Sequence, residues 1–560
     1  MKRITGFGLA LLAAARFASA EPIATRSPTS GATPPAAAKP RLDGAHARVS
    51  FSQAGRLSEN IASLRGRRAE PLSAEEVTAK QIEALLRGPL RYGVTGIYVA
   101  DARSGEALFA VNADDPLNPA SNVKMISTAT AIELMGPQFR YSTRVLGAEP
   151  DAAGTIHGDI YLLGTWDPTL EAGDLDQLAE QLVMRGVKAL DGNVVVGSDP
   201  QRDGLYHASI PIEVRAGAPG EAPTASAPPG VDLLAFDITA KTAKTAQRPR
   251  LTYAAQSTTD AAGQLRVHVA IAGTIGKAGV VAYDLPMIEH TAAAAQLLRA
   301  AMRAHQIDVK GNVSSRELGD FIGAAVTAGG LPAELARHDS ATLAEIVTKV
   351  NKWSINWLAD RVIETTAGLA HRQAPTMAGA LDAMYDWLDR HTHVAKADVL
   401  VDSGSGLSYH TRITARELVA VVRDAAGFTA PNAGSQAWLG SLSIGGTDGT
   451  LGRRFRTPNL RGLVHAKTGT LSTVIALSGV LDVDPERPLV FSIVTNGDRP
   501  LQKAYVRKAH EQLVGLLAAY AVRTAKIAPP APVVVPSLAP NLPPADDAEE
   551  PDVEVPETNY

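Results

Sequence analysis

Three short motifs with chemically reactive side chains lie far apart in the chain, at residues 121–124, 354–356 and 467–469. They read Ser-Asn-Val-Lys, Ser-Ile-Asn and Lys-Thr-Gly. The first and third patterns occur once, and the second recurs only at 58–60. A fold that uses them together must join positions separated by 233 and 113 residues. This spacing favours one domain whose chain is interrupted by a large insertion.

The pattern around the motifs alternates helical and strand-like segments. Ser73 opens a capping box before a helix that should reach Arg87. Strand-like runs follow at 94–100 and 106–111. Pro119 then suits the entry to a helix that starts near Ser121. An amphipathic helix is expected from Leu343 to Thr366, strands after Arg461, and a last helix at about 502–522. The sequence therefore predicts an α/β fold, with an antiparallel sheet covered by helices and a helical part beside it.

The middle of the chain has a different sequence pattern. Short strand-like runs alternate with Gly, Pro and Asp turns, with one clear helix at about 175–185. We interpret 147–330 as one or two inserted subdomains, and assign 71–146 and 331–526 to the catalytic domain.

Both ends of the chain differ from the middle. Residues 1–20 have a charged start, a short apolar run and a small-residue Ala-Ser-Ala site, which predicts a secretory signal peptide. Residues 21–70 are rich in Ala, Pro and Arg, with eight Lys/Arg against four Asp/Glu. Residues 527–560 carry nine Pro and seven Asp/Glu, with no Lys or Arg. We expect both segments to be disordered, as solvated tails or as charged arms that tether the protein to polymers or partners.

Composition excludes several classes of protein. The chain has no Cys, which rules out disulfide scaffolds, thiolate metal sites and cysteine nucleophiles. Lys plus Arg number 54 and Asp plus Glu 58, and a net charge of −4 argues against a globally basic nucleic-acid binder. Beyond the start of the chain we find no apolar run of transmembrane length. The expectation is a soluble, exported, periplasmic protein.

The residue types of the three motifs fit nucleophilic catalysis. A serine hydroxyl needs a base to take its proton. Residues three apart share one face of a helix, so Lys124 can reach Ser121. Lys467 can lower the proton affinity of Lys124 and hold a substrate carboxylate, and backbone N–H groups at the helix start can stabilise an oxyanion. Ser354 can relay a proton, Asn356 can fix Lys124 and the substrate, and Gly469 leaves room for substrate along the strand.

This set of motifs is that of penicillin-binding proteins and serine β-lactamases. The chain resembles the D-alanyl-D-alanine carboxypeptidases/endopeptidases of the penicillin-binding protein 4 type (serine peptidase family S13) over roughly residues 75–520. The long gap between the first two motifs fits that family. Further resemblance lies in the segments Asp167-Pro-Thr-Leu, Val350-Asn-Lys-Trp-Ser, Asp402-Ser-Gly-Ser-Gly-Leu-Ser, Asp448-Gly-Thr-Leu and Ala466-Lys-Thr-Gly-Thr-Leu.

The resemblance implies a transpeptidase-like fold with a large inserted module, and an exported serine DD-peptidase. Its expected catalytic residues are Ser121, Lys124, Ser354 and Asn356. Its expected substrate-binding residues are Lys467, Thr468, Gly469 and Thr470. Substrates would be peptidoglycan peptides, inhibitors would be β-lactam antibiotics such as penicillin, and no cofactor, metal or nucleic acid is expected. Carboxypeptidase and endopeptidase cleavage would share the site and both stay open, as does the oligomeric state.

Three positions depart from the family pattern. Ile355 stands where Asp is frequent, Tyr409 where members commonly carry Arg, and Ser472 where some members carry Gln. The resemblance links the Arg to the diamino-acid side chain of the peptide, so these departures predict a changed side-chain preference.

Other readings stay open beside the peptidase. A non-catalytic wall-binding homologue would fail to label with a fluorescent penicillin, whereas a β-lactamase or esterase would turn over nitrocefin steadily. The pair His391 and His393 near Asp389 resembles a metal site without an evident third ligand. The Gly-rich run at 445–449 is a turn rather than a phosphate loop. The arginines 453, 454 and 456 form a solvated patch or contact an anionic glycan strand.

Overall fold

The computed structural model describes residues 72–198, 204–205, 209–228, 231, 233–259, 265–286 and 290–525. The signal peptide expected at 1–20, the segment 21–70 and the tail 527–560 lie outside these described residues.

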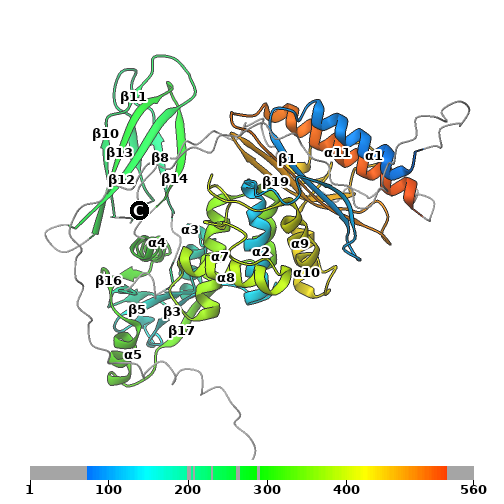
Figure 1. Ribbon diagram of the computed structural model, residues 1–560. Coiled ribbons are helices and arrows are strands. Elements are labelled where there is room, and N and C mark those ends of the chain that lie inside the picture. The colour runs from blue at the N-terminus through cyan, green and yellow to red at the C-terminus, as the bar shows by residue number, and fades with distance from the viewer. Residues whose placement is uncertain are drawn as a thin grey trace, which may run out of the picture. The chain divides into compact units, whose positions relative to one another are not determined.

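A six-stranded antiparallel sheet forms the centre of the catalytic part (Figure 1). Segments from both ends of the chain meet in it, because β1 pairs with β21 along its whole length, from Val94 opposite Asn496 to Asp101 opposite Leu489. In spatial order its strands are β18 (Ser443–Ile444), β19 (Val464–Leu471), β20 (Val474–Leu481), β21 (Leu489–Asn496), β1 (Val94–Asp101) and β2 (Ala107–Val111).

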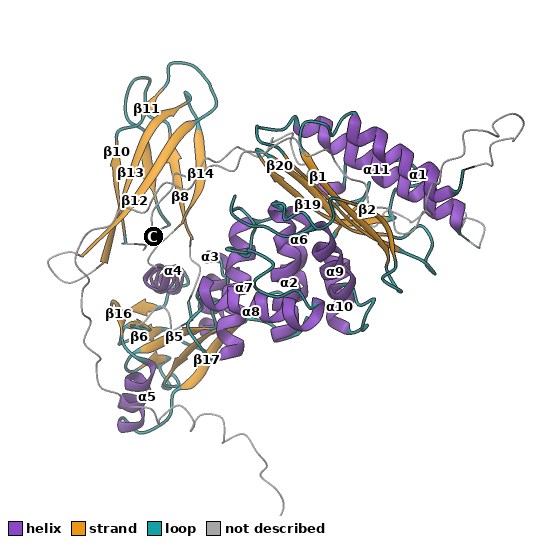
Figure 2. Ribbon diagram, viewed as in Figure 1, coloured by secondary structure: helices purple, strands orange, loops and turns teal. Residues whose placement is uncertain are grey.

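Helices cover both faces of this sheet (Figure 2). Since side chains alternate along a strand, Ile97 and Val99 join the core under α1 (Ala74–Arg87) and α11 (Lys503–Thr524). Tyr98 and Ala100 join the core of the helical part on the other face. Burial on both faces explains why β20 and β21 are nearly continuous apolar runs.

The helical part surrounds the segment that carries Ser121. A large apolar core joins its helices to one face of the sheet. Its elements are η1 (Ala120–Val123), α2 (Lys124–Met135), α6 (Leu343–Trp353), α7 (Asn356–His371), α8 (Met377–Thr392), α9 (Ala415–Ala425), α10 (Ala433–Ser441) and η2 (Gly449–Leu451).

Local signals predicted some helix starts and missed one break. Ser73 and Glu76 form the expected capping box at α1. The continuous helix expected from Leu343 to Thr366 is wrong. Ser354 adopts a left-handed conformation (φ 58°, ψ 36°) that ends α6, and α7 begins at Asn356. The apolar period continues across this break, so periodicity alone does not reveal it.

The insertion begins and ends in two paired strands. β3 (Ser142–Gly147) leads out of the catalytic part and β17 (Ala333–Asp339) leads back, and the two pair antiparallel. Both belong to a five-stranded sheet with the order β16-β7-β5-β3-β17. The bounds 147–330 of the inserted module stay a prediction. The other elements of this part of the insertion are β4 (Thr155–Ile156), β5 (Ile160–Gly164), α3 (Ala172–Met184), β6 (Ala189–Leu190), β7 (Val194–Val196), α4 (His290–Ala304), β15 (Asp308–Val309), β16 (Val313–Ser315) and α5 (Leu318–Thr327). Of these, β15, β6 and β4 form a separate three-stranded sheet.

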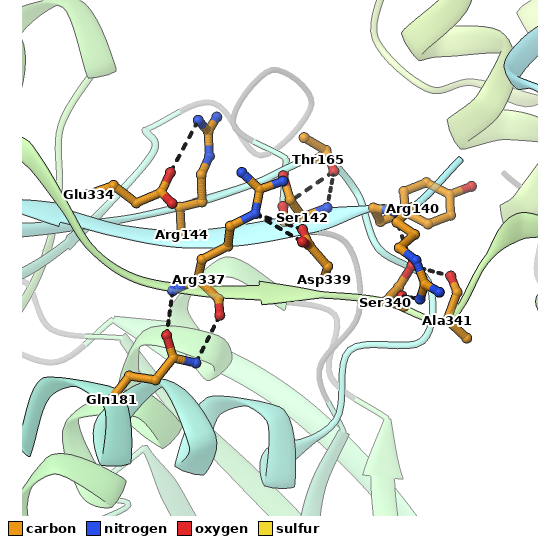
Figure 3. A network of polar contacts seen from close by, with 11 residues as sticks. Arg140, Ser142, Arg144, Thr165, Gln181, Glu334, Arg337, Asp339, Ser340 and Ala341 are labelled. Carbon is orange, nitrogen blue, oxygen red and sulfur yellow. Dashed lines mark hydrogen bonds and ion pairs between the residues drawn. The ribbon is translucent and has the colours of Figure 1, made fainter. Parts of the chain in front are cut away.

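Polar side chains tie these two strands to their neighbours (Figure 3). The Gln181 amide on α3 accepts from Arg337 N at 2.9 Å and donates to Arg337 O at 2.8 Å. Because β17 is an edge strand of this sheet, the amide takes the place of the backbone groups that a further strand would offer. Arg140 donates to Ser340 O at 2.5 Å where the chain leaves and returns.

A second set of strands completes the insertion. β12 and β13 form a long antiparallel pair, and β10 and β11 pair parallel with β13. A separate three-stranded sheet has the order β14-β8-β9. These elements are β8 (Ser209–Arg215), β9 (Thr224–Ser226), β10 (Leu234–Ile238), β11 (Lys241–Thr242), β12 (Arg250–Thr259), β13 (Leu265–Ile275) and β14 (Val280–Pro286).

Candidate active site

Ser121 lies in the short 3₁₀ turn η1 rather than in the α-helix itself, which begins at Lys124. The residue before it, Ala120, is fully buried and left-handed, with φ 47°. Asn118 holds this turn, since its Oδ1 accepts from Ala120 N at 2.8 Å and its Nδ2 donates to Ser408 O at 2.9 Å. The left-handed residue, unusual for a non-glycine, turns the chain sharply just before Ser121.

Lys124 meets Ser121 as the motif spacing predicted. Its Nζ lies 3.0 Å from Ser121 Oγ, 2.6 Å from Asn356 Oδ1 and 2.7 Å from Ser405 O. The side chain is completely buried. The buried amine therefore lies next to the hydroxyl whose proton a general base would have to take.

Ser354 and Asn356 enter the site from the break between α6 and α7. The left-handed backbone of Ser354 reverses the chain there. Ser354 Oγ accepts from Lys467 Nζ at 2.8 Å, while the Asn356 amide contacts Lys124. The second motif therefore contacts both of the other two.

Lys467 lies on β19 and is also fully buried. Besides Ser354, its Nζ donates to Thr468 O at 3.0 Å. The short strand β18 pairs only with His465 and Ala466 of β19. In the described structure β19 from Lys467 onward is therefore the outer strand of the sheet, where an extended peptide can lie alongside it.

Gly469 performs a packing role that the sequence did not suggest. A Cβ atom there would lie 2.5 Å from Pro119 O and 3.2 Å from Ala120 Cβ. The missing side chain thus lets β19 approach the turn that carries Ser121. Thr470 contacts α11, since Arg507 Nη2 donates to its Oγ1 at 3.1 Å. Thr468 Oγ1 instead donates to Thr450 Oγ1 at 3.0 Å.

The loop at 403–408 completes the surroundings of Lys124. Its Ser405 carbonyl accepts from Lys124, and its Gly404 carbonyl accepts from Ser127 Oγ at 2.8 Å. Gly406 has φ 73°, and a Cβ there would lie 2.1 Å from Ala120 O. The alternating Ser and Gly of this segment fit its close contact with η1 and α2.

Two carboxyl groups on α7 lie behind this loop, and sequence reasoning missed both. Asp360 Oδ1 accepts from Ser405 N at 2.8 Å. Burial raises the pKa of Asp360, opposed by hydrogen bonds from Ser405 and by the positive charge of Lys124. Burial also raises the pKa of Glu364 to about 7, opposed by Arg361 and reinforced by Asp360. Asn356, Asp360 and Glu364 recur every four residues, so they share one face of the helix.

The Asp448-Gly-Thr-Leu segment supports the second and third motifs. Lys352, two residues before Ser354, donates to Asp448 Oδ2 at 2.6 Å and to Leu442 O at 3.0 Å. These contacts fix the end of α6. Thr450 meets Thr468 on β19, so the same segment joins α6 to the Lys-Thr-Gly strand.

The two departures at 409 and 472 contact each other. The Tyr409 hydroxyl lies 2.8 Å from Ser472 Oγ, and Tyr409 is half exposed. Arg412, three residues further along the chain, donates to the carbonyls of Tyr409 and Thr411, both at 2.7 Å. A neutral pair of hydroxyls therefore occupies this position.

The other candidate sites have structural partners. His391 lies between Glu133 Oε2 at 2.6 Å and Asp424 Oδ2 at 2.9 Å, and so joins α8 to α2 and α9. Within the described ranges no group of three or more His, Asp or Glu residues is placed to hold a metal ion. Arg454 pairs with Glu511 on α11 at 2.6 Å, whereas Arg453 and Arg456 are exposed. The run at 445–449 includes the turn before η2.

Comparison with known proteins assigns the family. A sequence profile of the D-Ala-D-Ala carboxypeptidase 3 (S13) family matches residues 78–520. The chain belongs to this family. The D-alanyl-D-alanine carboxypeptidase of Actinomadura sp. (strain R39) is 31% identical over 468 residues, which cover 75% of this chain and 80% of that protein. The D-alanyl-D-alanine carboxypeptidase DacB of Haemophilus influenzae is 24% identical over 412 residues, covering 68% and 80%.

The fold agrees with this assignment. The structure of penicillin binding protein 4 from Haemophilus influenzae, complexed with a novel β-lactam, superposes with a TM-score of 0.61 at 20% identity, covering 78% of this chain and 99% of that one. The predicted fold class is thereby confirmed. The prediction of a serine-type D-Ala-D-Ala carboxypeptidase is confirmed at the level of the family, which supports a peptidoglycan DD-peptidase. Among the described helices, none is both long and apolar enough to cross a membrane.

Proposed function

We propose that this S13 protein is an exported DD-peptidase that cleaves D-Ala–D-Ala, or D-Ala–diamino-acid cross-links, through an acyl-enzyme on Ser121. The contacts of Lys124 Nζ carry this proposal. A neutral amine has two N–H donors and one lone pair. Asn356 Oδ1 and Ser405 O can only accept, at 2.6 and 2.7 Å. When Lys124 is neutral, these two oxygens can accept its N–H groups, and its lone pair can take the proton of the Ser121 hydroxyl, 3.0 Å away.

The reaction follows from this arrangement. Lys124 takes the proton of Ser121, and Oγ bonds to the carbonyl carbon of the D-Ala–D-Ala peptide bond. The backbone N–H of Ser121 stabilises the oxyanion, because the N–H of Ala120 is already bonded to Asn118 Oδ1. The C–N bond then breaks, and the leaving amine takes up a proton relayed from Lys124 through Ser354. Water hydrolyses the ester, with Lys124 acting as base again.

Substrate recognition rests on β19. The substrate peptide lies along the outer edge of this strand, and its terminal carboxylate is bound by Lys467 and the hydroxyl of Thr468. Gly469 and Thr470 contribute backbone groups. Penicillin, which carries a carboxylate beside a reactive carbonyl, acylates Ser121 in the same orientation and inhibits the enzyme.

Adduct mapping tests this proposal. Purified protein is incubated with benzylpenicillin, digested, and examined by peptide mass spectrometry. We expect one adduct on the peptide containing Ser121, and none in Ser121→Ala. Purified cell-wall muropeptides should lose D-Ala, or be cut at cross-links, only with the wild type. An adduct on another serine, or steady turnover of nitrocefin without an adduct, contradicts the proposal.

We also propose that the protein is exported to the periplasm through residues 1–20. The charged start, apolar run and Ala-Ser-Ala site support this proposal. The mature protein should begin at Glu21, which intact-mass measurement of the periplasmic protein checks. Recovery of an uncleaved chain from the cytoplasm contradicts it.

A further inference from the structure

We propose that Asp360 is a positioning residue for the general base: its carboxylate fixes the peptide backbone of Ser405, and the Ser405 carbonyl in turn orients the Lys124 amine. The proposal rests on the function proposed above, in which Lys124 takes the proton of Ser121. It concerns a residue outside the three motifs.

The first step is the contact between Asp360 and the 403–408 loop. Asp360 Oδ1 accepts from Ser405 N at 2.8 Å. Gly404 lies directly on α7, because a Cβ atom there would be 2.6 Å from Ile363 Cγ2 and 3.3 Å from Asp360 Oδ1. Any larger residue at 404 would push the loop away from α7. The carboxylate and the glycine therefore place Ser405 together.

The second step runs from Ser405 to the amine. The N–H of Ser405 meets Asp360, while its C=O accepts from Lys124 Nζ at 2.7 Å. One residue thus joins the carboxylate to the base. Since the Ser405 carbonyl accepts from the Lys124 amine, moving this carbonyl would let the amine shift relative to Ser121 Oγ, which lies 3.0 Å from it.

The third step is the shared helix. Asn356 supplies the other acceptor for Lys124 and lies one turn before Asp360 on α7. A single rigid helix thus sets both acceptors, one directly and one through the loop. Sites held by rigid elements keep the sub-ångström geometry that proton transfer needs.

The negative charge of Asp360 should also affect the pH dependence of acylation. The charged groups that face Asp360 are Lys124 from α2 and Glu364 from α7. Glu364 is itself paired with Arg361. The loop contributes backbone N–H groups and the Ser405 hydroxyl, which are neutral. A carboxylate facing Lys124 favours the protonated amine. Replacing it by an amide of the same shape should therefore let Lys124 work at lower pH.

The test compares Asp360→Ala with Asp360→Asn on the full chain. The benzylpenicillin acylation rate constant and the non-covalent dissociation constant are measured separately from pH 5 to 9, normalised to the fraction of sites that acylate. In Asp360→Ala the rate constant should fall about 10- to 100-fold with the dissociation constant unchanged. Asp360→Asn, which keeps an acceptor for Ser405 N, should recover most of the rate and shift the acidic limb of the pH profile to lower pH.

Asp382→Asn is the matched control, because Asp382 is exposed on α8 and pairs with Lys396. It should behave like the wild type. Wild-type acylation at Ser121 is established first, so a failure of the proposed function would appear there and not in the variants. If Asp360→Ala acylates at the wild-type rate, or if Asp360→Asn is as slow as Asp360→Ala with an unmoved pH profile, Asp360 does not position the base.

Discussion

Glu364 should make the catalytic part less stable as the pH rises. Its side chain is only 8% exposed, and burial raises its pKa to about 7, from an ordinary value of 4.5. The native state therefore binds this proton more tightly than the unfolded chain does. Stability from the bound proton is complete below pH 4.5 and is lost as the pH rises through 7.

The size of the effect follows from the two pKa values. A tenfold change in proton affinity corresponds to about 1.4 kcal/mol, so the difference between 4.5 and about 7 is worth about 3 kcal/mol. Gln at this position removes the titration and keeps the shape. The free energy of unfolding of Glu364→Gln, relative to the wild type, should therefore rise by about 3 kcal/mol between pH 4 and pH 8.

Urea unfolding followed by tryptophan fluorescence measures this difference. Four of the five tryptophans lie in the helical part, at 353, 357, 387 and 438, so the signal reports on the region around Glu364. Glu345→Gln is an opposite control. Hydrogen bonds from Thr342 lower the pKa of Glu345, so its replacement should cost more stability at pH 8 than at pH 4. A Glu364→Gln difference that stays flat, or falls with pH, would refute the reasoning.

Four further predictions concern single residues. Gly469→Ala should displace the turn carrying Ser121 and lower the penicillin acylation rate about tenfold or more, whereas Gly440→Ala, at a position with open space around it, should not. Lys467→Ala should weaken non-covalent penicillin binding about 10- to 100-fold in stopped-flow titrations, because a charge-assisted hydrogen bond to the carboxylate is lost. Complete burial lowers the pKa of His510 to about 3. The free energy of unfolding should therefore fall by about 1.4 kcal/mol for each pH unit below 6.5, and His510→Gln should flatten this slope when unfolding is measured by heating. Tyr409→Arg should raise the ratio of kcat/KM for diaminopimelate over lysine peptides about tenfold, and an unchanged ratio would mean that this position does not read the side chain.

The sequence predicted those parts of the fold and site that depend on neighbouring residues. The Ser121–Lys124 contact follows from a spacing of three on a helical turn, and the capping box of α1 from Ser73 and Glu76. Short apolar, β-rich runs predicted the central strands. Contacts between distant segments left no such pattern. Asp360 reads as an ordinary acidic residue on a helix, and only the folded chain brings it to Ser405, 45 positions later.

Backbone strain at two residues explains how the motifs meet. Ala120 and Ser354 are both non-glycine residues in the left-handed region, at φ 47° and 58°. Such a conformation costs about 1 kcal/mol or more and persists only where the surroundings hold it. At Ala120 two glycines allow that hold, because Gly406 and Gly469 let the loop and β19 contact the backbone of Pro119 and Ala120. The strain turns Ser121 and Ser354 out of regular helix, toward Lys124 and Lys467. The same glycines that look permissive in the sequence therefore enforce the geometry on which the chemistry depends.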